Sequence, residues 1–287
     1  MGTAQRVVVF VILSYTTALL LDVTSLYGWL PLILWGFVRM WSVSLSVVLC
    51  LVIFRESVSS NFRRFLGFST RLLRLYLLSP LLIYAALGIY ISLAVPLNLF
   101  DFSAYIDLIA EEVSSGLAGE QAAHSAVILA YAQIALAYAT AITLNAFLAL
   151  GEEIGWRGYL YNLLGSKPGV ATALGIGVLW GLWHASAIIL LGYNYQINRL
   201  VGVALFTTLT MLFTYPQLSV TEMAGGSVLP ATSFHGAINA IWGLTMVATR
   251  LRWEDAEILL GLGLMGIIAW IVTNIVFQIL MKKARFL

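Results

Sequence analysis

The sequence predicts an all-α, polytopic membrane protein, and two observations carry that prediction. Of the 287 residues, 61% are hydrophobic and only 10% are charged, whereas a soluble domain carries roughly 25% charged residues. The hydrophobic residues also run in stretches that approach the roughly 20 residues a helix needs to cross a bilayer. Because so few polar side chains are present to face water, we expect one integral membrane domain over residues 1–287.

The composition also excludes several other classes of protein. Cys50 is the one cysteine, so neither an intrachain disulfide nor a Cys-rich metal cluster can form. The net charge of +2 is too small to indicate nucleic-acid binding. In a membrane protein, ionisable residues outside the loops are costly and usually functional. The few that occur here are therefore the first candidates for a functional site.

The first apolar run, residues 7–21, is short and ends at Asp22. Its length is compatible with the apolar part of a signal peptide. Arg6 is the only basic residue before it, however, and no small-residue cleavage site follows. We therefore expect a first membrane span there.

The second apolar stretch is interrupted by Pro31 and Arg39, so we place the second span at 37–54. Residues 27–36 then lie at the membrane interface, where tyrosine and tryptophan are favoured. Arg39 is expected to extend its charged end to the interface. The six remaining spans are predicted at 75–95, 122–150, 170–191, 200–215, 234–248 and 258–281.

The charges between these spans predict the orientation. Residues 55–74 hold five arginines and one glutamate, whereas residues 96–121 hold five acidic residues and no lysine or arginine. Cytoplasmic segments are enriched in lysine and arginine, so we expect both termini in the cytoplasm. Eleven basic residues then lie in cytoplasmic segments: Arg6, Arg55, Arg63, Arg64, Arg71, Arg74, Arg157, Lys167, Lys282, Lys283 and Arg285.

The first candidate motif is Glu152-Glu153-x-x-x-Arg157. Glu153 and Arg157 stand four residues apart and can pair on a helix. Glu152 points about 100° away from Glu153 around the helix and stays free. A carboxylate beside a neutralised neighbour can act as a general base for water. The alternative is a solvated helix end with one ordinary salt bridge.

His184 lies near the middle of the predicted fifth span. In a soluble protein, a single histidine on an apolar face is usually a satisfied core residue. A membrane span makes that reading weaker, because any partner must also be brought into the bilayer. We therefore favour a functional role for His184. His124, which lies near a predicted span end, is expected to be exposed and is left outside the site.

His235 and Asn239 are one helical turn apart, so they face the same side of the predicted seventh span. A histidine and an asparagine facing one cavity can donate hydrogen bonds to an oxyanion. The alternative is hydrogen bonding that only joins helices, which is worth about 0.6 kcal/mol in membranes.

Placed around one cavity, Glu152, His184, His235 and Asn239 supply a base, a second proton carrier and two oxyanion donors. Such a set can hydrolyse an amide without a covalent intermediate. Cys50 lies within the second predicted span, away from these groups, which argues against a cysteine protease. Two histidines and a glutamate could instead ligate zinc, although no His-Glu-x-x-His motif is present.

The order and spacing of these residues resemble a known family. The Glu-Glu-x-x-x-Arg motif, a histidine in the next hydrophobic helix and His-x-x-x-Asn are similar to the three motifs of the CAAX-protease and bacteriocin-processing family of intramembrane endopeptidases. More narrowly, the chain resembles the Ras-converting (type II) CAAX prenyl protease, in which a glutamate is the base. The resemblance covers about 144–243, which we expect to form the catalytic core.

The resemblance implies eight helical spans around a cavity that opens to the cytosol. It also implies hydrolysis of a peptide bond near the C-terminus of prenylated CAAX-type substrates in the lipid bilayer, with no cofactor or metal. The implied roles are Glu152 as the base for water with help from His184, His235 and Asn239 as the oxyanion hole, and Glu153 and Arg157 as supporting residues.

Two features depart from a simple match. The family often has phenylalanine four residues before the histidine of the fifth helix, and this chain has Trp180, so we expect a reshaped pocket. The predicted spans also place Glu152 at a membrane boundary and His184 past the middle of the bilayer, ~15 Å apart in depth. A tilted fourth helix or different helix ends would remove that separation.

Two alternatives stay open. The first is a zinc-dependent membrane protease that uses Glu152, His184 and His235 as ligands. The second is a non-enzymatic membrane scaffold, immunity protein or transporter. The intramembrane polar residues gather in the second half of the chain, which argues against a transporter built from two symmetric repeats.

Overall fold

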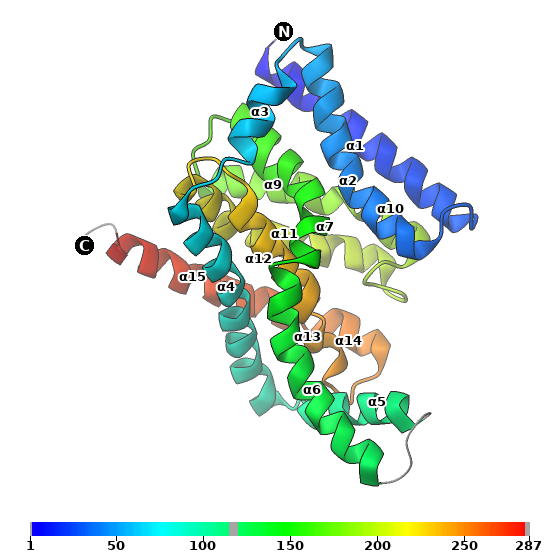
Figure 1. Cartoon of the computed structure of the whole chain (residues 1–287). Helices are drawn as coiled ribbons and strands as arrows, with labels where there is room; N and C mark the ends of the chain where they lie inside the picture. Colours follow the sequence, from blue (N-terminus) through cyan, green and yellow to red (C-terminus); the bar gives the residue numbers. More distant parts are fainter. Residues whose placement is uncertain (1, 115–119, 285–287) are drawn as a thin grey trace.

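The structure is a computed structural model that describes residues 2–114 and 120–284. The described residues form helices and connecting turns without strands (Figure 1). Among them, seven helices are long and apolar enough to cross a membrane. These findings confirm the predicted all-α, polytopic membrane fold. The seven candidate spans are Thr3–Leu26, Leu32–Ile53, Thr70–Leu97, Gln121–Ala141, Val170–Leu191, Arg199–Met223 and Trp253–Lys282.

The first two spans form a hairpin of α1 (Thr3–Leu26) and α2 (Leu32–Ile53). α1 continues past Asp22, the residue at which the sequence places its end. It can do so because the Asp22 carboxylate is fully buried and accepts hydrogen bonds from Arg39 of α2. The expected interfacial position of Arg39 is therefore wrong, since its side chain lies inside the bundle.

Beyond this hairpin, the short α3 (Val58–Phe65) leads into α4 (Thr70–Ala94), and the 3-10 turn η1 (Val95–Leu97) leads into α5 (Phe102–Ser114). α3 begins at an N-cap serine, Ser57, whose hydroxyl accepts from the Ser60 amide. His124, on the following helix, is exposed as predicted.

The predicted fourth span, 122–150, is two helices: α6 (Glu120–Ala141) and α7 (Leu144–Glu153). The helix breaks because α12 crosses there. A Cβ on Gly236 of α12 would lie 2.5 Å from the Ala141 carbonyl oxygen and 2.8 Å from the Ala146 amide nitrogen. α7 also approaches α2 closely at Gly151, where a Cβ would meet the Met40 carbonyl oxygen at 2.7 Å. A π-helical turn, η2 (Ile154–Leu160), and α8 (Tyr161–Leu163) follow.

The fifth span bends at His184, between α9 (Val170–Trp183) and α10 (Ala185–Leu191). α9 packs against α11 (Arg199–Met223) through Gly177-x-x-x-Gly181, a small-residue spacing that lets membrane helices approach closely. A Cβ at these two positions would lie 2.4 Å from the Met211 Cα and 2.5 Å from the Thr207 Cα.

Replacing Gly177 with alanine is therefore expected to destabilise the protein by about 1–3 kcal/mol, because backbone rather than a flexible side chain must move. Gly175→Ala on the same helix is the matched control, since a Cβ there meets nothing within 4 Å. Thermal unfolding in detergent should show a lower Tm for the first variant alone. Equal Tm values would contradict this account of the α9–α11 contact.

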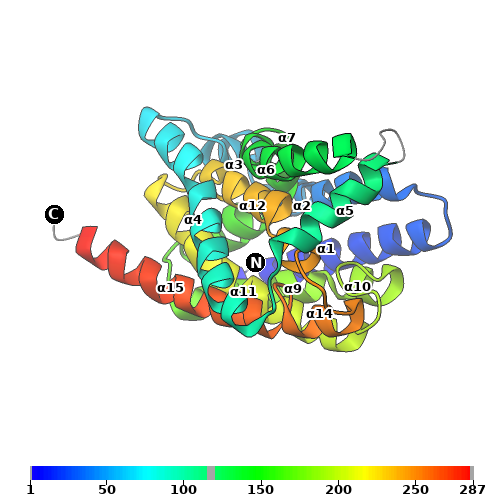
Figure 2. The ribbon, with the colours of Figure 1, turned by 90° about the horizontal axis from the view of Figure 1, so that it is seen from below.

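The predicted seventh span, 234–248, differs most from the structure. It is α12 (Leu229–Ile241), a helix of 13 residues, followed by the single turn α13 (Leu244–Val247). Thirteen residues are too few to cross a bilayer, so α12 is not among the seven candidate spans. It packs instead against α4, α6, α7 and α11 inside the bundle (Figure 2). The chain ends with α14 (Trp253–Leu259) and α15 (Leu264–Ala284). Arg285 of the predicted cytoplasmic tail lies outside the described residues.

Candidate active site

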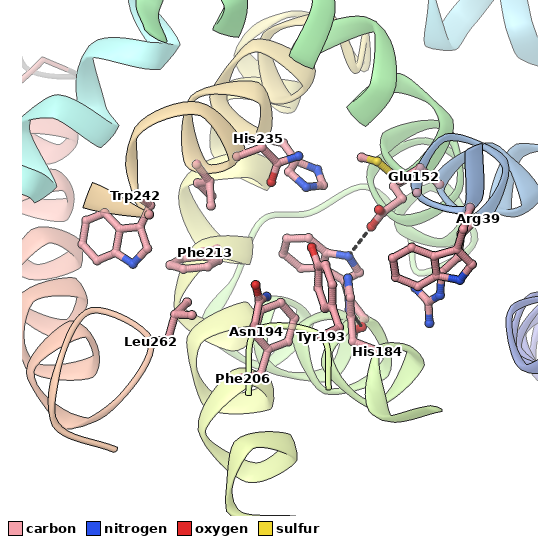
Figure 3. A pocket seen from close by; sticks show the side chains of 17 residues that line it. Arg39, Glu152, His184, Tyr193, Asn194, Phe206, Phe213, His235, Trp242 and Leu262 are labelled. Atoms are coloured by element: carbon pink, nitrogen blue, oxygen red, sulfur yellow. Dashed lines mark hydrogen bonds between the residues drawn. The ribbon is translucent and has the colours of Figure 1, made fainter. Parts of the chain in front are cut away.

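The four residues predicted to be catalytic line one cavity of about 240 Å³ (Figure 3). Glu152 comes from α7, His184 from the α9–α10 junction, and His235 and Asn239 from α12. The first three side chains are nearly buried, whereas Asn239 lies at the more exposed part of the cavity. Aromatic and aliphatic side chains form most of the remaining wall: Trp35, Met40, Trp180, Tyr193, Phe206, Phe213, Ile238, Trp242 and Leu262.

Glu152 reaches the cavity because α7 is a separate helix. The break after α6 redirects the chain, and Glu152 thereby meets the fifth span at the depth of Trp180 rather than at a membrane boundary. The Trp180 Nε1–H donates to Glu152 Oε2 at 2.6 Å, as the dashed line in Figure 3 shows. Trp180 therefore contacts the candidate base directly, a role that phenylalanine could not fill.

His184 is held in a defined tautomer. Its Nδ1 lies 2.9 Å from the Trp180 carbonyl oxygen. A carbonyl oxygen only accepts, so Nδ1 carries the hydrogen and Nε2 of the neutral ring is an acceptor. The ring packs edge-on against Trp183 and Phe206, with both centroid distances 4.7 Å. These contacts fix the ring plane at the cavity wall.

Glu153, unlike Glu152, is part of a buried polar network. Its Oε1 accepts from Arg157 Nη1 at 3.2 Å, as the four-residue spacing predicts. The same oxygen lies 2.8 Å from His235 Nδ1, a contact between residues that are 82 positions apart. Arg157 also donates to Thr214 and Gln217 of α11, and its guanidinium lies 4.0 Å from the Trp180 ring centroid.

This network orients His235 toward the cavity. Because Nδ1 is held by Glu153, Nε2 is the ring nitrogen left to face the cavity. The His235 ring also meets Trp180 edge-on, at a centroid distance of 5.2 Å. Trp180 thus contacts the carboxylate of Glu152, the guanidinium of Arg157 and the imidazole of His235.

Arg39 is a residue of this region that sequence reasoning excluded. It lines the same cavity, with an exposed fraction of 3%. Its Nε and Nη2 donate to the Asp22 carboxylate at 2.8 and 3.2 Å, and Nη2 also donates to the Trp183 carbonyl at 2.8 Å. Trp35, expected at the interface, is likewise buried and donates to Asp22. The sequence did hold a signal for this buried pair, because Asp22 and Arg39 are opposite charges in two neighbouring apolar stretches.

The described residues hold no group of three His, Cys, Asp or Glu side chains placed to share a metal ion. Glu152, His184 and His235 line one cavity, but they are not such a group.

The fold and the cavity define a polytopic membrane protein with a buried carboxylate and two imidazoles around one pocket. Residues 132–241 match the family model described as Type II CAAX prenyl endopeptidase Rce1-like. This segment contains all six predicted site residues, and the match confirms the resemblance found in the motifs. At the level of the family, it supports a CAAX-type intramembrane protease. Searches of curated proteins and of solved structures returned no match.

Proposed function

We propose that the chain is a glutamate-dependent intramembrane endopeptidase that acts on CAAX-type, prenylated peptide substrates. The observation that carries this proposal is the different environment of the two adjacent glutamates. Glu153 is committed to Arg157 and His235. Among the described residues, Glu152 accepts one side-chain hydrogen bond, from Trp180, which leaves Oε1 for a water molecule in the cavity.

In the proposed reaction, Glu152 removes a proton from water as the water oxygen attacks the scissile carbonyl carbon. A carbon–oxygen bond forms, and the carbonyl oxygen becomes an oxyanion. The carbon–nitrogen bond then breaks, and the leaving amine takes the proton from Glu152. His184 assists through Nε2, which is free to accept a hydrogen bond from the same water.

His235 and Asn239 are the proposed donors to the oxyanion. The His235 Nε2 can donate only when both ring nitrogens carry a proton, since Nδ1–H faces Glu153. The Glu153 carboxylate supplies the negative charge that matches this imidazolium. Asn239 stands one turn further along α12 at the same cavity, where its side-chain amide can donate. Removing one such donor typically costs about 100-fold to 1,000-fold in kcat.

The size of the cavity limits what part of the substrate it encloses. Its volume of about 240 Å³ falls below the ~300–1,000 Å³ of pockets that surround a drug-sized ligand. We therefore assign the cavity to the scissile segment, with any attached lipid lying along the apolar helices toward the bilayer. The aromatic wall suits the aliphatic residues of a CAAX sequence.

The test is cleavage of a farnesylated CAAX peptide by the purified protein in detergent, followed by mass spectrometry. A matched peptide without the farnesyl group and parallel reactions with a chelator complete the design. We expect cleavage of the farnesylated peptide that is unaffected by the chelator. Strong inhibition by the chelator, reversed by zinc, would support the metal-dependent alternative, and intact peptides throughout would contradict a protease of this type.

Trp180→Phe tests how the base is held. A hydrogen bond to a charged group contributes about 1.5–3 kcal/mol, so loss of the Nε1–H donor should lower kcat by roughly 10-fold to 150-fold. Trp183→Phe is the matched control, because it also loses an indole donor but one that serves the Ser14 carbonyl. Equal kcat values for the two variants would show that the Trp180 hydrogen bond is not used in catalysis.

A further inference from the structure

The bend at His184 changes the backbone hydrogen bonds of the fifth span. In a regular α-helix, the amide of His184 would donate to the carbonyl of Trp180. Here the His184 amide donates to the Gly181 carbonyl instead, at 3.0 Å. The Trp180 carbonyl is therefore left to the His184 ring, whose Nδ1 lies 2.9 Å away. The tautomer of His184 thus depends on the bend, since a straight helix would bring the backbone amide to the same carbonyl.

Two charged side chains of the first two spans contact both sides of this bend. On the α9 side, Arg39 Nη2 donates to the Trp183 carbonyl at 2.8 Å. On the α10 side, Ser186 Oγ donates to Asp22 Oδ2 at 2.6 Å. Arg39 and Asp22 are joined to each other by two hydrogen bonds, at 2.8 and 3.2 Å. The three side chains of Asp22, Arg39 and Ser186, called the Asp22–Arg39 clamp here, therefore bridge the bend at His184.

The charged part of the clamp is buried and fixed. Asp22 is fully buried, and Arg39 has an exposed fraction of 3%. Trp35 Nε1 also donates to Asp22, at 2.8 Å, so the carboxylate accepts four hydrogen bonds. Ionisable groups inside a membrane bundle are costly and mark function, and apolar residues often stabilise such a site equally well. Stability alone is therefore a poor explanation for this pair.

The place of the clamp in the molecule indicates what it serves. Arg39 lines the same cavity as Glu152 and His184, as Figure 3 shows. Asp22 and Arg39 both precede residues 132–241, the segment that matches the family model. The match therefore gives these two residues no role, although they contact the fifth span on either side of a candidate catalytic histidine.

We propose that Asp22, Arg39 and Ser186 are positioning residues that hold the bend and thereby set the tautomer of His184. With the clamp in place, Nδ1 carries the hydrogen and Nε2 can accept from the attacking water. Without it, α9 continues into α10, the backbone amide takes the Trp180 carbonyl, and the ring populates both tautomers. A ring with hydrogen on Nε2 cannot accept from water there. The effect on cleavage rests on the proposed function, whereas the effect on the tautomer does not.

The double variant Asp22→Leu, Arg39→Met removes the clamp without leaving an isolated charge. Replacing a whole buried pair in this way is often neutral for stability. Displacing a catalytic group slightly is far more costly for the reaction, so kcat for the farnesylated peptide should fall by roughly 10-fold to 100-fold. KM should stay unchanged, because His184 acts on the water and not on substrate binding.

Ser186→Ala is a milder variant that keeps the two charges paired. Loss of its hydrogen bond to Asp22 should lower kcat by roughly 3-fold to 10-fold. Ser186→Thr retains the hydroxyl and should restore kcat. Ser79→Ala is the matched control, since the Ser79 hydroxyl donates to the Leu75 carbonyl of its own helix, α4. A purely structural role would lower the Tm of Ser186→Ala in detergent and leave the kcat of the folded protein unaltered.

Nitrogen NMR of the imidazole rings, with isotope-labelled histidine, reads the tautomer without relying on cleavage. The chain has three histidines, and His184→Gln identifies the signal of His184. We expect the unsubstituted protein to show a protonated Nδ1 and an unprotonated Nε2 at His184. The double variant and Ser186→Ala should show a mixture of tautomers, and Ser79→Ala should not.

A His184 signal that keeps a protonated Nδ1 in both clamp variants would overturn the inference, whatever their kcat values. Unchanged kcat in a folded double variant of an active enzyme would overturn it as well. If the double variant does not fold, a Ser186→Ala protein that matches Ser79→Ala in kcat and in the His184 signal is the contradicting result. If the unsubstituted protein cleaves no peptide, the proposed function fails, and the NMR comparison alone decides whether the clamp sets the tautomer.

Discussion

Replacing Glu152 with glutamine is expected to lower kcat for peptide cleavage by roughly 100-fold to 10,000-fold, the usual contribution of a general base. Glutamine has the same shape and keeps an oxygen that can accept from Trp180 Nε1–H. It cannot remove a proton from water. Since the variant loses charge but not volume at a buried site, the protein should remain folded while hydrolysis is lost.

Glu222→Gln is the matched control for this variant. Glu222 lies in the last turn of α11, which is also an apolar helix, but its side chain is exposed. It should therefore tolerate the change. Steady-state cleavage of the farnesylated peptide and Tm in detergent are measured for both. If the Glu152→Gln protein retained kcat within a factor of two, Glu152 could not be the general base of the reaction.

Replacing Glu153 with alanine is expected to destabilise the protein by about 3–5 kcal/mol, because it leaves a buried charge without its partner. Arg157 has an exposed fraction of 1%, and Glu153 is the carboxylate that pairs with it. The same change removes the acceptor of His235 Nδ1. Loss of stability should therefore accompany loss of cleavage, in contrast to the Glu152→Gln result. Chemical or thermal unfolding in detergent measures it.

The double variant Glu153→Leu, Arg157→Met separates the two effects. Exchanging a whole buried ion pair for apolar residues is often neutral for stability. The Tm of the double variant should therefore lie closer to that of the unsubstituted protein than the Tm of Glu153→Ala does. Cleavage should stay low, because His235 still lacks its carboxylate. If the single Glu153→Ala change left Tm unaltered, Glu153 would not be needed to neutralise the buried charge of Arg157.

The sequence was sufficient for the fold class, because apolar stretches of membrane-spanning length dominate it. It could not show where helices break inside such a stretch. Residues 122–150 contain no Asp, Glu, Lys or Arg, so no charge marks the break between α6 and α7, which follows from the close approach of α12 at Gly236. That same break brings Glu152 into the cavity, which removes the ~15 Å separation expected from unbroken spans.

Within the site, local spacing predicted the contacts that depend on one helix. The Glu153–Arg157 pair follows from its four-residue separation. The bond from His235 to Glu153 and that from Trp180 to Glu152 join different helices, and no local pattern encodes them. Arg39 was misplaced for the same reason, since its buried state depends on Asp22 of the preceding helix.

The central claim is that Glu152 activates water to hydrolyse a peptide bond, and an isotope measurement tests it most directly. Excess purified protein is mixed with the farnesylated peptide in water labelled with a heavy oxygen isotope, so that each molecule turns over once. The account predicts that the new carboxyl group of the product carries one heavy oxygen atom. A product without the heavy isotope would show that an oxygen of the protein attacked instead, and the absence of any cleaved product would contradict the enzymatic function.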